Sequence, residues 1–349
     1  MTNQVKLDDL DRLVIGALLA HPRATHSEIC QAVGSSEATV SRRLSRLLRI
    51  RAVRVVGVLD DHLSRRARSV LVRLRCSPGA ADGVARAIAQ WDESGSVKVL
   101  TGTVDCVAEL AYTSNEHLYR LMMEQLPRLE GIVASFSNQV IRRFSTPHGW
   151  NPGILSTHAV RALQSQRLDL WDEIPEPDTV AELSPLDEQL IAALAGDGRL
   201  GWQGLADRCG VTPRTARKHV GSLMAGGILR MRTVVEPELV GFPVDAFISL
   251  SINPTKLSAA GETLVQHPGV LMIAATTGDR NLCGEVAVAS DKALYNLLVD
   301  TIGNLPGLLH ADVAVGLSTV KRAGMIMGYG PALTTGLPDR WSAPARPRA

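Results

Sequence analysis

The chain of 349 residues contains two copies of one sequence pattern, offset from each other by 176 positions. Identities between the copies begin near the start and include Leu10, Asp11, Ile15, Ala17, Leu18, Arg23, Gly34, Thr39, Leu47 and Arg54. The register does not change further along, where Thr101-Gly102 matches Thr277-Gly278 and Leu118-Tyr119 matches Leu294-Tyr295. Each copy is too long for a solenoid unit. The repeat therefore predicts two homologous modules of domain size, each able to form its own core.

The composition, with 45% hydrophobic and 21% charged residues, is typical of a soluble globular protein. A formal net charge of +2 excludes a polybasic carrier, so any affinity for nucleic acid must come from local basic clusters. The five cysteines form no Cys-x-x-Cys pair, which argues against a disulfide or zinc framework. The opening segment lacks the basic stretch of a signal peptide, and no apolar run is long enough to span a bilayer. We therefore expect a cytoplasmic protein with no membrane partner.

Each copy opens with three short helical patterns. In the first copy Asp8, Thr25 and Ser36 are the expected N-caps, Glu28 completes a capping box with Thr25, and Gly34 ends the second helix. The second copy repeats this plan from Leu186 to Ala195, from Trp202 to Cys209, and from Thr212-Pro213 onward. Two short helices joined at a glycine by a tight turn predict a helix-turn-helix in each copy.

After the helices the apolar period changes to that of strands alternating with helices in the order βαββαβ. This order predicts a ferredoxin-like α+β sandwich, with a four-stranded antiparallel sheet and both helices on one face. The expected elements of the first copy are Val70–Arg75, Ala80–Gln90, Val97–Leu100, Val107–Tyr112, Asn115–Gln125 and Val133–Ile141. Those of the second copy are Ala246–Ile252, Leu257–Gln266, Val270–Ala275, Leu282–Val288, Asp291–Ile302 and Ala311–Leu317.

A proline- and glycine-rich segment lies between the copies and contains one helix-compatible stretch, Thr157–Leu170, so it is interpreted as a linker with a docked helix. The last residues are rich in Pro, Ala and Arg and are interpreted as a mobile tail. The expected domains are a helix-turn-helix over 1–60, an effector domain over 61–144, the linker over 145–182, the second helix-turn-helix over 183–236, the second effector domain over 237–322 and the tail over 323–349.

Arginines dominate the third helix of the first copy, with no acid between Glu37 and Asp60. An unopposed basic stripe on this third helix, the last of the helix-turn-helix, is typical of a DNA-binding surface. A basic helix face that is only solvated is the plainer alternative. The candidate DNA-contacting residues of the first copy are Ser36, Glu37, Ala38, Ser41, Arg42, Arg43, Ser45 and Arg46, of which Arg43 and Arg46 are best placed for phosphates. In the second copy they are Arg214, Arg217 and Lys218.

This arrangement resembles the Lrp/AsnC (feast/famine) transcription regulators, here in duplicate. The resemblance rests on the Leu10-Asp11 opening, the starts of the third helices at Ser36 and Thr212-Pro213, the exit Gly227-Ile228-Leu229-Arg230, and the turn TGTVD at 101–105. It implies an α+β fold, a tandem repeat of a winged-type helix-turn-helix followed by a ferredoxin-like effector domain. The first copy departs from the family by having Arg51 where the helix-ending glycine is usual, so its third helix is expected to run on or to end differently.

The resemblance also implies binding of a small molecule, often an amino acid, at the turn between the second and third sheet strands. It assigns this role to Gly102 and Asp105, where the glycine admits a carboxylate and the aspartate accepts from an ammonium group. In the second copy the corresponding residues are Gly278 and Asn281, and the loss of the acid weakens that site. Any hairpin turn prefers the same residue types, which is the alternative explanation.

The sequence therefore predicts a regulator that binds double-stranded DNA and a small-molecule effector, forms a homo-oligomer, and is not an enzyme. Single-copy relatives pair their effector sheets between chains; here the halves pair either within one chain or between chains. The histidines lack metal-ligand spacing, and neither a metal nor a cofactor is expected. Two other classes stay open, a siroheme-decarboxylase-like enzyme of the same architecture and an architectural DNA-coating protein. An arginine-lined third helix argues against the enzyme.

Overall fold

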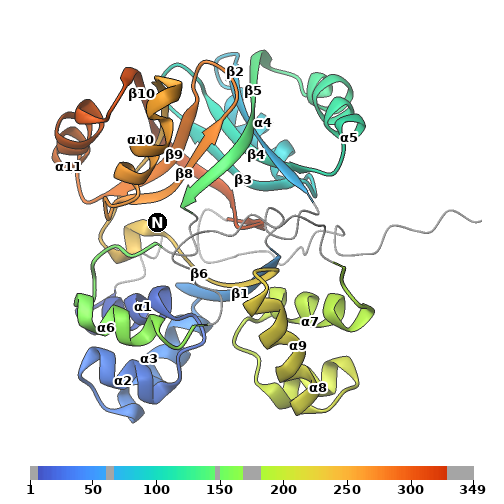
Figure 1. The fold of residues 1–349 in the computed structure, drawn as a ribbon, viewed down its shortest axis with the longest axis vertical. Coiled ribbons are helices and arrows are strands. Elements are labelled where there is room, and N and C mark those ends of the chain that lie inside the picture. The colour runs from blue at the N-terminus through green and yellow to red at the C-terminus, as the bar shows by residue number, and fades with distance from the viewer. Residues whose placement is uncertain (1–6, 60–66, 146–149, 168–181, 328–349) are drawn as a thin grey trace, which may run out of the picture.

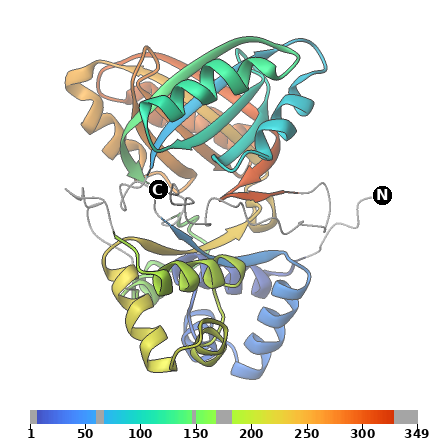
Figure 2. The same cartoon turned by 90° about the vertical axis from the view of Figure 1, so that its right-hand side faces the viewer.

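The computed structural model describes residues 7–59, 67–145, 150–167 and 182–327. The two helix-turn-helix units lie side by side on one side of the molecule, and the two effector domains form one body above them (Figure 1; Figure 2). The expected α+β tandem repeat is therefore confirmed, and both modules contribute to each of the two layers.

The helix-turn-helix units have the predicted elements and caps. The side chains of Asp8, Thr25 and Ser36 accept the expected backbone hydrogen bonds, Thr25 with Glu28 forms the capping box, and Gly34 adopts the left-handed conformation that ends the second helix. The elements of the first unit are α1 (Asp9–Ala20), α2 (His26–Val33), α3 (Glu37–Arg49) and β1 (Val53–Leu59). Those of the second unit are α7 (Pro185–Gly196), α8 (Trp202–Cys209), α9 (Pro213–Ala225) and β6 (Leu229–Val235).

The end of α3 does not require the glycine that the sequence lacks. Arg51 adopts a φ of 55°, in the left-handed region, and Gly227 adopts a φ of 75° at the equivalent position after α9. Both helices therefore end in the same way, and the first copy accepts an unfavourable backbone conformation at a non-glycine residue. The expectation that α3 runs on or ends differently is wrong.

Strands β1 and β6 join the two helix-turn-helix units in an antiparallel ladder, with Val53 opposite Val235 and Leu59 opposite Leu229. At its centre Val56 faces Arg232, which is the same position of the repeat. Because equivalent residues meet only on the axis that relates two copies, an internal twofold axis passes through this pair.

Each effector domain has the expected strand order. The first contains β2 (Arg68–Cys76), α4 (Ala81–Ala89), β3 (Ser94–Leu100), β4 (Cys106–Tyr112), α5 (Asn115–Tyr119) and β5 (Ile132–Ser145). The second contains β7 (Val244–Ile252), α10 (Leu257–Leu264), β8 (Val270–Thr276), β9 (Leu282–Val288), α11 (Asp291–Asn296) and β10 (Leu308–Arg322). The helices expected at 115–125 and 291–302 are interrupted, since α5 and α11 continue as π-helical turns over Arg120–Gln125 and Leu297–Thr301.

The two sheets close on each other within one chain. The end of β5 pairs with β8 of the other module, and the end of β10 pairs with β3, so the strands form a continuous ring. The inner faces share a core that contains Leu71, Val107, Phe247 and Cys283. The open face of each sheet is therefore covered inside the chain, and the pairing that the sequence left open is intramolecular.

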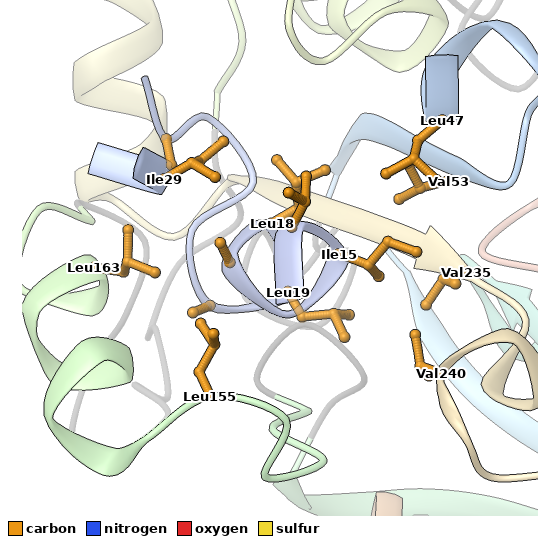
Figure 3. Close-up of a cluster of buried hydrophobic side chains, with 14 of the residues drawn as sticks. Ile15, Leu18, Leu19, Ile29, Leu47, Val53, Leu155, Leu163, Val235 and Val240 are labelled. Carbon is orange, nitrogen blue, oxygen red and sulfur yellow. The ribbon is translucent and has the colours of Figure 1, made fainter. Parts of the chain in front are cut away.

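The described part of the linker belongs to the first helix-turn-helix unit. Helix α6 (Thr157–Gln164) was expected as a docked helix, and Leu155 and Leu163 pack beside α1 in the same core as Ile15 and Leu18 (Figure 3). The second copy adds Val235 and Val240 to this core (Figure 3). The Trp150 indole donates to the carbonyl of Pro268 at 3.0 Å. The linker thus connects the first helix-turn-helix unit to the second effector domain.

The predicted start of the tail, at residue 323, is too early, because strand β11 (Met325–Ile326) pairs with β10. The rest of the expected tail, 328–349, and residues 168–181 of the expected linker lie outside the described residues. Among the residues that the structure describes, no helix is long and apolar enough to cross a membrane.

Candidate nucleic-acid interface and effector turns

Helix α3 buries Val40, Leu44 and Leu47 and turns a polar face to solvent, as its spacing predicts. The candidate residues that lie exposed on this helix or at its N-cap are Ser36, Glu37, Ala38, Arg42 and Ser45, and Ser41 is partly buried. The Ser36 hydroxyl accepts the backbone N–H of Thr39 at 3.3 Å and donates to the Thr39 hydroxyl at 2.9 Å. Among the candidate arginines of this helix, Arg42 has no carboxylate partner within the described residues.

The other two candidate arginines of α3, Arg43 and Arg46, are opposed by acids from helix α1. The Arg43 guanidinium lies 2.5 Å from the carboxylate of Asp8 and 3.1 Å from that of Asp11, which also pairs with Arg46 at 2.8 Å. The backbone N–H of Asp11 and the Arg43 side chain lower the pKa of Asp8, and these carboxylates raise the pKa of Arg43. The interpretation of Arg43 and Arg46 as unopposed is wrong, because α1 packs its acidic first turn against them. Their contact with DNA stays a prediction.

Helix α9 presents its cations differently. Arg214, Arg217 and Lys218 are all exposed, and no ion pair holds them among the residues that the structure describes. The position of Arg43 is taken by His219, whose Nδ1 lies 2.8 Å from the Asp187 carboxylate. Both units thus fasten the third helix to the first through a buried or half-buried aspartate. The second unit leaves more positive charge free on its outer face.

Two of the candidate effector residues, Asp105 and Asn281, form hydrogen bonds with the last residues of strands β2 and β7. The Asp105 carboxylate accepts the backbone N–H of Cys76 at 2.8 Å. Asn281, its counterpart, accepts the N–H of Ile252 and donates to the carbonyl of the same residue, both at 2.8 Å. Asp105 and Asn281 are therefore half-buried structural groups, and removal of the Asp105 carboxylate would leave the backbone N–H of Cys76 without this acceptor.

The two effector turns lie at the seams between modules, one at each seam. The backbone N–H of Thr101, next to Gly102, donates to Val315 of β10 at 2.8 Å. That of Thr277, next to Gly278, donates to Gln139 of β5 at 2.9 Å. Gly102 and Asp105 thus share one turn, Gly278 and Asn281 share the other, and the structure does not bring the two pairs together.

The seam at residues 277–281 also gathers charged side chains that the sequence reasoning missed. Arg73, buried on β2, donates to the Asn138 side chain at 2.9 Å and lies 3.8 Å from the Asp279 carboxylate. Arg280 adds a second guanidinium beside Asp279 at 3.8 Å. The other seam has Ser249, Ala314 and Val104 in place of Arg73, Asn138 and Arg280. The sequence does contain one sign of this cluster, because Arg73 is a charged residue inside the otherwise apolar run Leu71–Leu74.

Comparisons with known families match the observed domains. The AsnC-type helix-turn-helix domain matches residues 7–48, and the Lrp/AsnC ligand binding domain matches both 69–148 and 245–326, together more than half of the chain. A winged helix-turn-helix DNA-binding domain matches 183–230. The chain belongs to the Lrp/AsnC family. Within this Lrp/AsnC protein the repeat is a duplication of the complete two-domain unit.

Relatives of single-copy size align with parts of this Lrp/AsnC protein. The HTH-type transcriptional regulator FL11 of Pyrococcus horikoshii is 26% identical over 140 residues, which is 40% of this chain and 92% of FL11. The Bkd operon transcriptional regulator of Pseudomonas aeruginosa is 29% identical over 149 residues, 40% of this chain and 95% of the relative. These named relatives support an Lrp/AsnC-type transcriptional regulator.

One solved structure matches both modules together. The siroheme decarboxylase NirDL superposes with a TM-score of 0.59 over 90% of this chain and 93% of its own, at 14% sequence identity. At this identity the match shows the fold alone. It supports the arrangement of two helix-turn-helix units below a closed pair of effector sheets.

Proposed function

We propose that this chain is a sequence-specific DNA-binding regulator in which one polypeptide presents two different reading helices, α3 and α9, that is, helices that contact base edges in the major groove. The observation that carries the proposal is the exposure, on α3 and α9, of cations without an ion pair to any residue that the structure describes. An internal twofold axis relates these two helices. A single-copy relative needs two chains to present two reading helices. Here the ladder of β1 with β6 supplies both from one chain.

The two outer faces differ at nearly every position, with Glu37, Ala38 and Arg42 on α3 and Arg214 and Lys218 on α9. The preferred duplex should therefore contain two unlike half-sites in inverted orientation. Selection from a random pool of duplexes, followed by footprinting, tests this. A strict palindrome protected by each chain would contradict the proposal.

Two other classes make different predictions for the same experiment. An architectural DNA-coating protein binds duplexes with little sequence preference, so selection would yield no consensus. An enzyme similar to siroheme decarboxylase would carry a tetrapyrrole, whose visible absorbance would accompany the purified protein. A consensus without that absorbance favours the regulator.

We also propose that a small metabolite such as an amino acid acts at the seams. The ligand-binding description of the family matches both effector domains, which supports this role. At the 277–281 turn, Arg73 and Arg280 supply cations suited to a carboxylate. Calorimetry of the protein against the twenty amino acids tests the idea, and the absence of heat with all of them would reject an amino-acid effector.

The sequence predicts a homo-oligomer, and this prediction now needs other surfaces, because the effector sheets already cover each other. Light scattering at micromolar concentration decides it. A mass of 37.4 kDa, that of one chain, would contradict the oligomer and leave one chain as the DNA-binding unit.

A further inference from the structure

Two arginines cross between the helix-turn-helix units in a reciprocal arrangement. Arg23 donates from Nη1 to the carbonyl of Gly198 at 2.6 Å and from Nη2 to that of Leu200 at 3.1 Å. Arg199 is the same position of the repeat, and it donates to the carbonyls of Pro22 and Ala24, both at 2.8 Å. Each guanidinium therefore holds the two carbonyls that flank the other arginine. We call these four hydrogen bonds the arginine clamp.

The clamp lies where both helix-turn-helix motifs begin. Ala24 directly precedes Thr25, the N-cap of α2, and Leu200 directly precedes Gly201, the N-cap of α8. The Arg23 guanidinium also stacks over the ring of Trp202, the first residue of α8, at 4.7 Å. Since α3 packs on α2 and α9 packs on α8, a shift at the clamp moves the reading helices with it.

The units are also joined by the β1–β6 ladder and by the core that Val235 and Val240 share with α1. A two-stranded ladder twists readily, and apolar packing is non-directional. The clamp adds donors and acceptors at fixed directions, which restrict rotation about the ladder. Arginine suits this task because its planar fork binds two acceptors in one geometry, which a lysine ammonium does not.

The clamp holds two positive charges close together, so electrostatics disfavour it as a contact that only stabilises the interface. Burial lowers the pKa of Arg23, and the nearby Arg199 lowers it further, whereas Asp197 opposes the shift. Burial likewise lowers the pKa of Arg199. Two like charges held together in an interface cost more free energy than apolar side chains of similar size. What the two arginines provide is a defined geometry between the two units.

We propose that Arg23 and Arg199 are positioning residues that set the spacing and rotation of the two half-sites that one chain reads. The inference rests on the proposed function, because it applies only if both helices bind one duplex. Half-sites separated by two additional base pairs turn by about a fifth of a helical turn relative to each other. A rigid pair of reading helices cannot follow that rotation, whereas a loosened pair can.

The test uses the full chain and duplexes that the wild type selects from a random pool. Two base pairs are inserted into or deleted from the centre of the selected duplex, and gel shifts give the affinity for each spacing. We expect the wild type to lose about tenfold or more at either altered spacing, a difference of roughly 1.4 kcal/mol. The double variant Arg23→Lys/Arg199→Lys keeps both charges but not the forks, and its loss should fall below about threefold.

Arg86→Lys is the matched control, because Arg86 bonds to Asp82 within the outer helix α4, away from the clamp. Its spacing profile should equal that of the wild type. Each single variant, Arg23→Lys or Arg199→Lys, keeps one fork and gives the same test if the double variant does not fold. A variant profile as narrow as that of the wild type, or an equal loss of affinity at every spacing, would overturn the inference. Failure to select any duplex would instead reject the proposed function.

Discussion

Val56 and Arg232 face each other at the centre of the ladder that joins the helix-turn-helix units, although they are the same position of the repeat. Arg232 interacts with Glu109 and Glu285, which are also equivalent positions, and with Arg322 of β10. Arg232 as a whole keeps some exposure, but its guanidinium lies deep enough that burial lowers its pKa to about 10. The internal axis thus carries one cation that interacts with both symmetry-related acids.

Arg232→Val should leave stability nearly unchanged. Glu109 keeps its ion pair with Arg143, and Glu285 keeps Lys98, so the substitution leaves neither carboxylate without a cation. The opposing position is already a valine. We expect the free energy of unfolding in urea to change by less than about 1 kcal/mol. A loss of several kcal/mol would mean that Arg232 is a principal link between the two layers.

Lys98→Met should be far more damaging than Arg232→Val. Lys98 is buried, and its Nζ lies 2.8 Å from the Asp245 carboxylate and 2.8 Å from that of Glu285. Without the ammonium these acids keep mainly Arg322, which is 3.4 Å from Asp245. Breaking a buried ion pair on one side costs roughly 3–5 kcal/mol, so denaturant unfolding at neutral pH should show a loss of that order.

The pH dependence of that loss provides the control. Burial alone would raise the pKa of Glu285, but Lys98 and Arg322 together lower it. In the wild type this carboxylate therefore stabilises the fold above the ordinary glutamate pKa and ceases to do so as pH falls through its lowered value. Without Lys98 the pKa rises, and protonation removes the buried charge. The deficit of Lys98→Met should shrink from pH 7 toward acid, and a deficit that does not change with pH would contradict this assignment.

The sequence predicted the local structure well and the contacts between distant segments poorly. Caps at Asp8, Thr25 and Ser36 follow from neighbouring residues, and all three are confirmed. The strands expected at 133–141 and 311–317 are longer in the structure because their ends pair with the other module. Period-2 patterning shows which residues face the core but not which strand lies alongside.

The candidate DNA-binding face shows the same limit. The exposure of Arg42 and of the α9 cations follows from helical spacing, whereas the engagement of Arg43 and Arg46 depends on how α1 packs across α3. A charge run read along one helix cannot show the acids that another helix brings to it. The arginine clamp is hidden for the same reason, since Arg23 and its acceptors lie far apart in the chain.

Arg42→Ala and Arg43→Ala should separate DNA contact from folding. Arg42 is exposed and has no ion pair within the described part of the chain, so its removal should leave the melting temperature unchanged. It should weaken binding and reduce the log–log salt slope by about 0.9 for one lost phosphate contact. Arg43→Ala removes a partner of the buried Asp11 and should lower the melting temperature. Gel shifts over a salt series and thermal melts measure both. An unchanged salt slope for Arg42→Ala would exclude it from the interface.

Asp105→Asn and Asp105→Ala should separate the structural role of this residue from a role in sensing. The carboxylate holds the backbone N–H of Cys76, and Asn281 performs the same task in the second module. Asparagine should therefore preserve stability, whereas alanine leaves a half-buried N–H without its acceptor, at a cost of roughly 1–3 kcal/mol in denaturant unfolding. If Asp105 also binds an ammonium group, Asp105→Asn loses a charged partner, and ligand affinity should fall about tenfold or more in calorimetry while stability holds. Equal ligand affinity in wild type and Asp105→Asn would leave Asp105 as a strand-end anchor alone and move the search for the effector to the Arg73 seam.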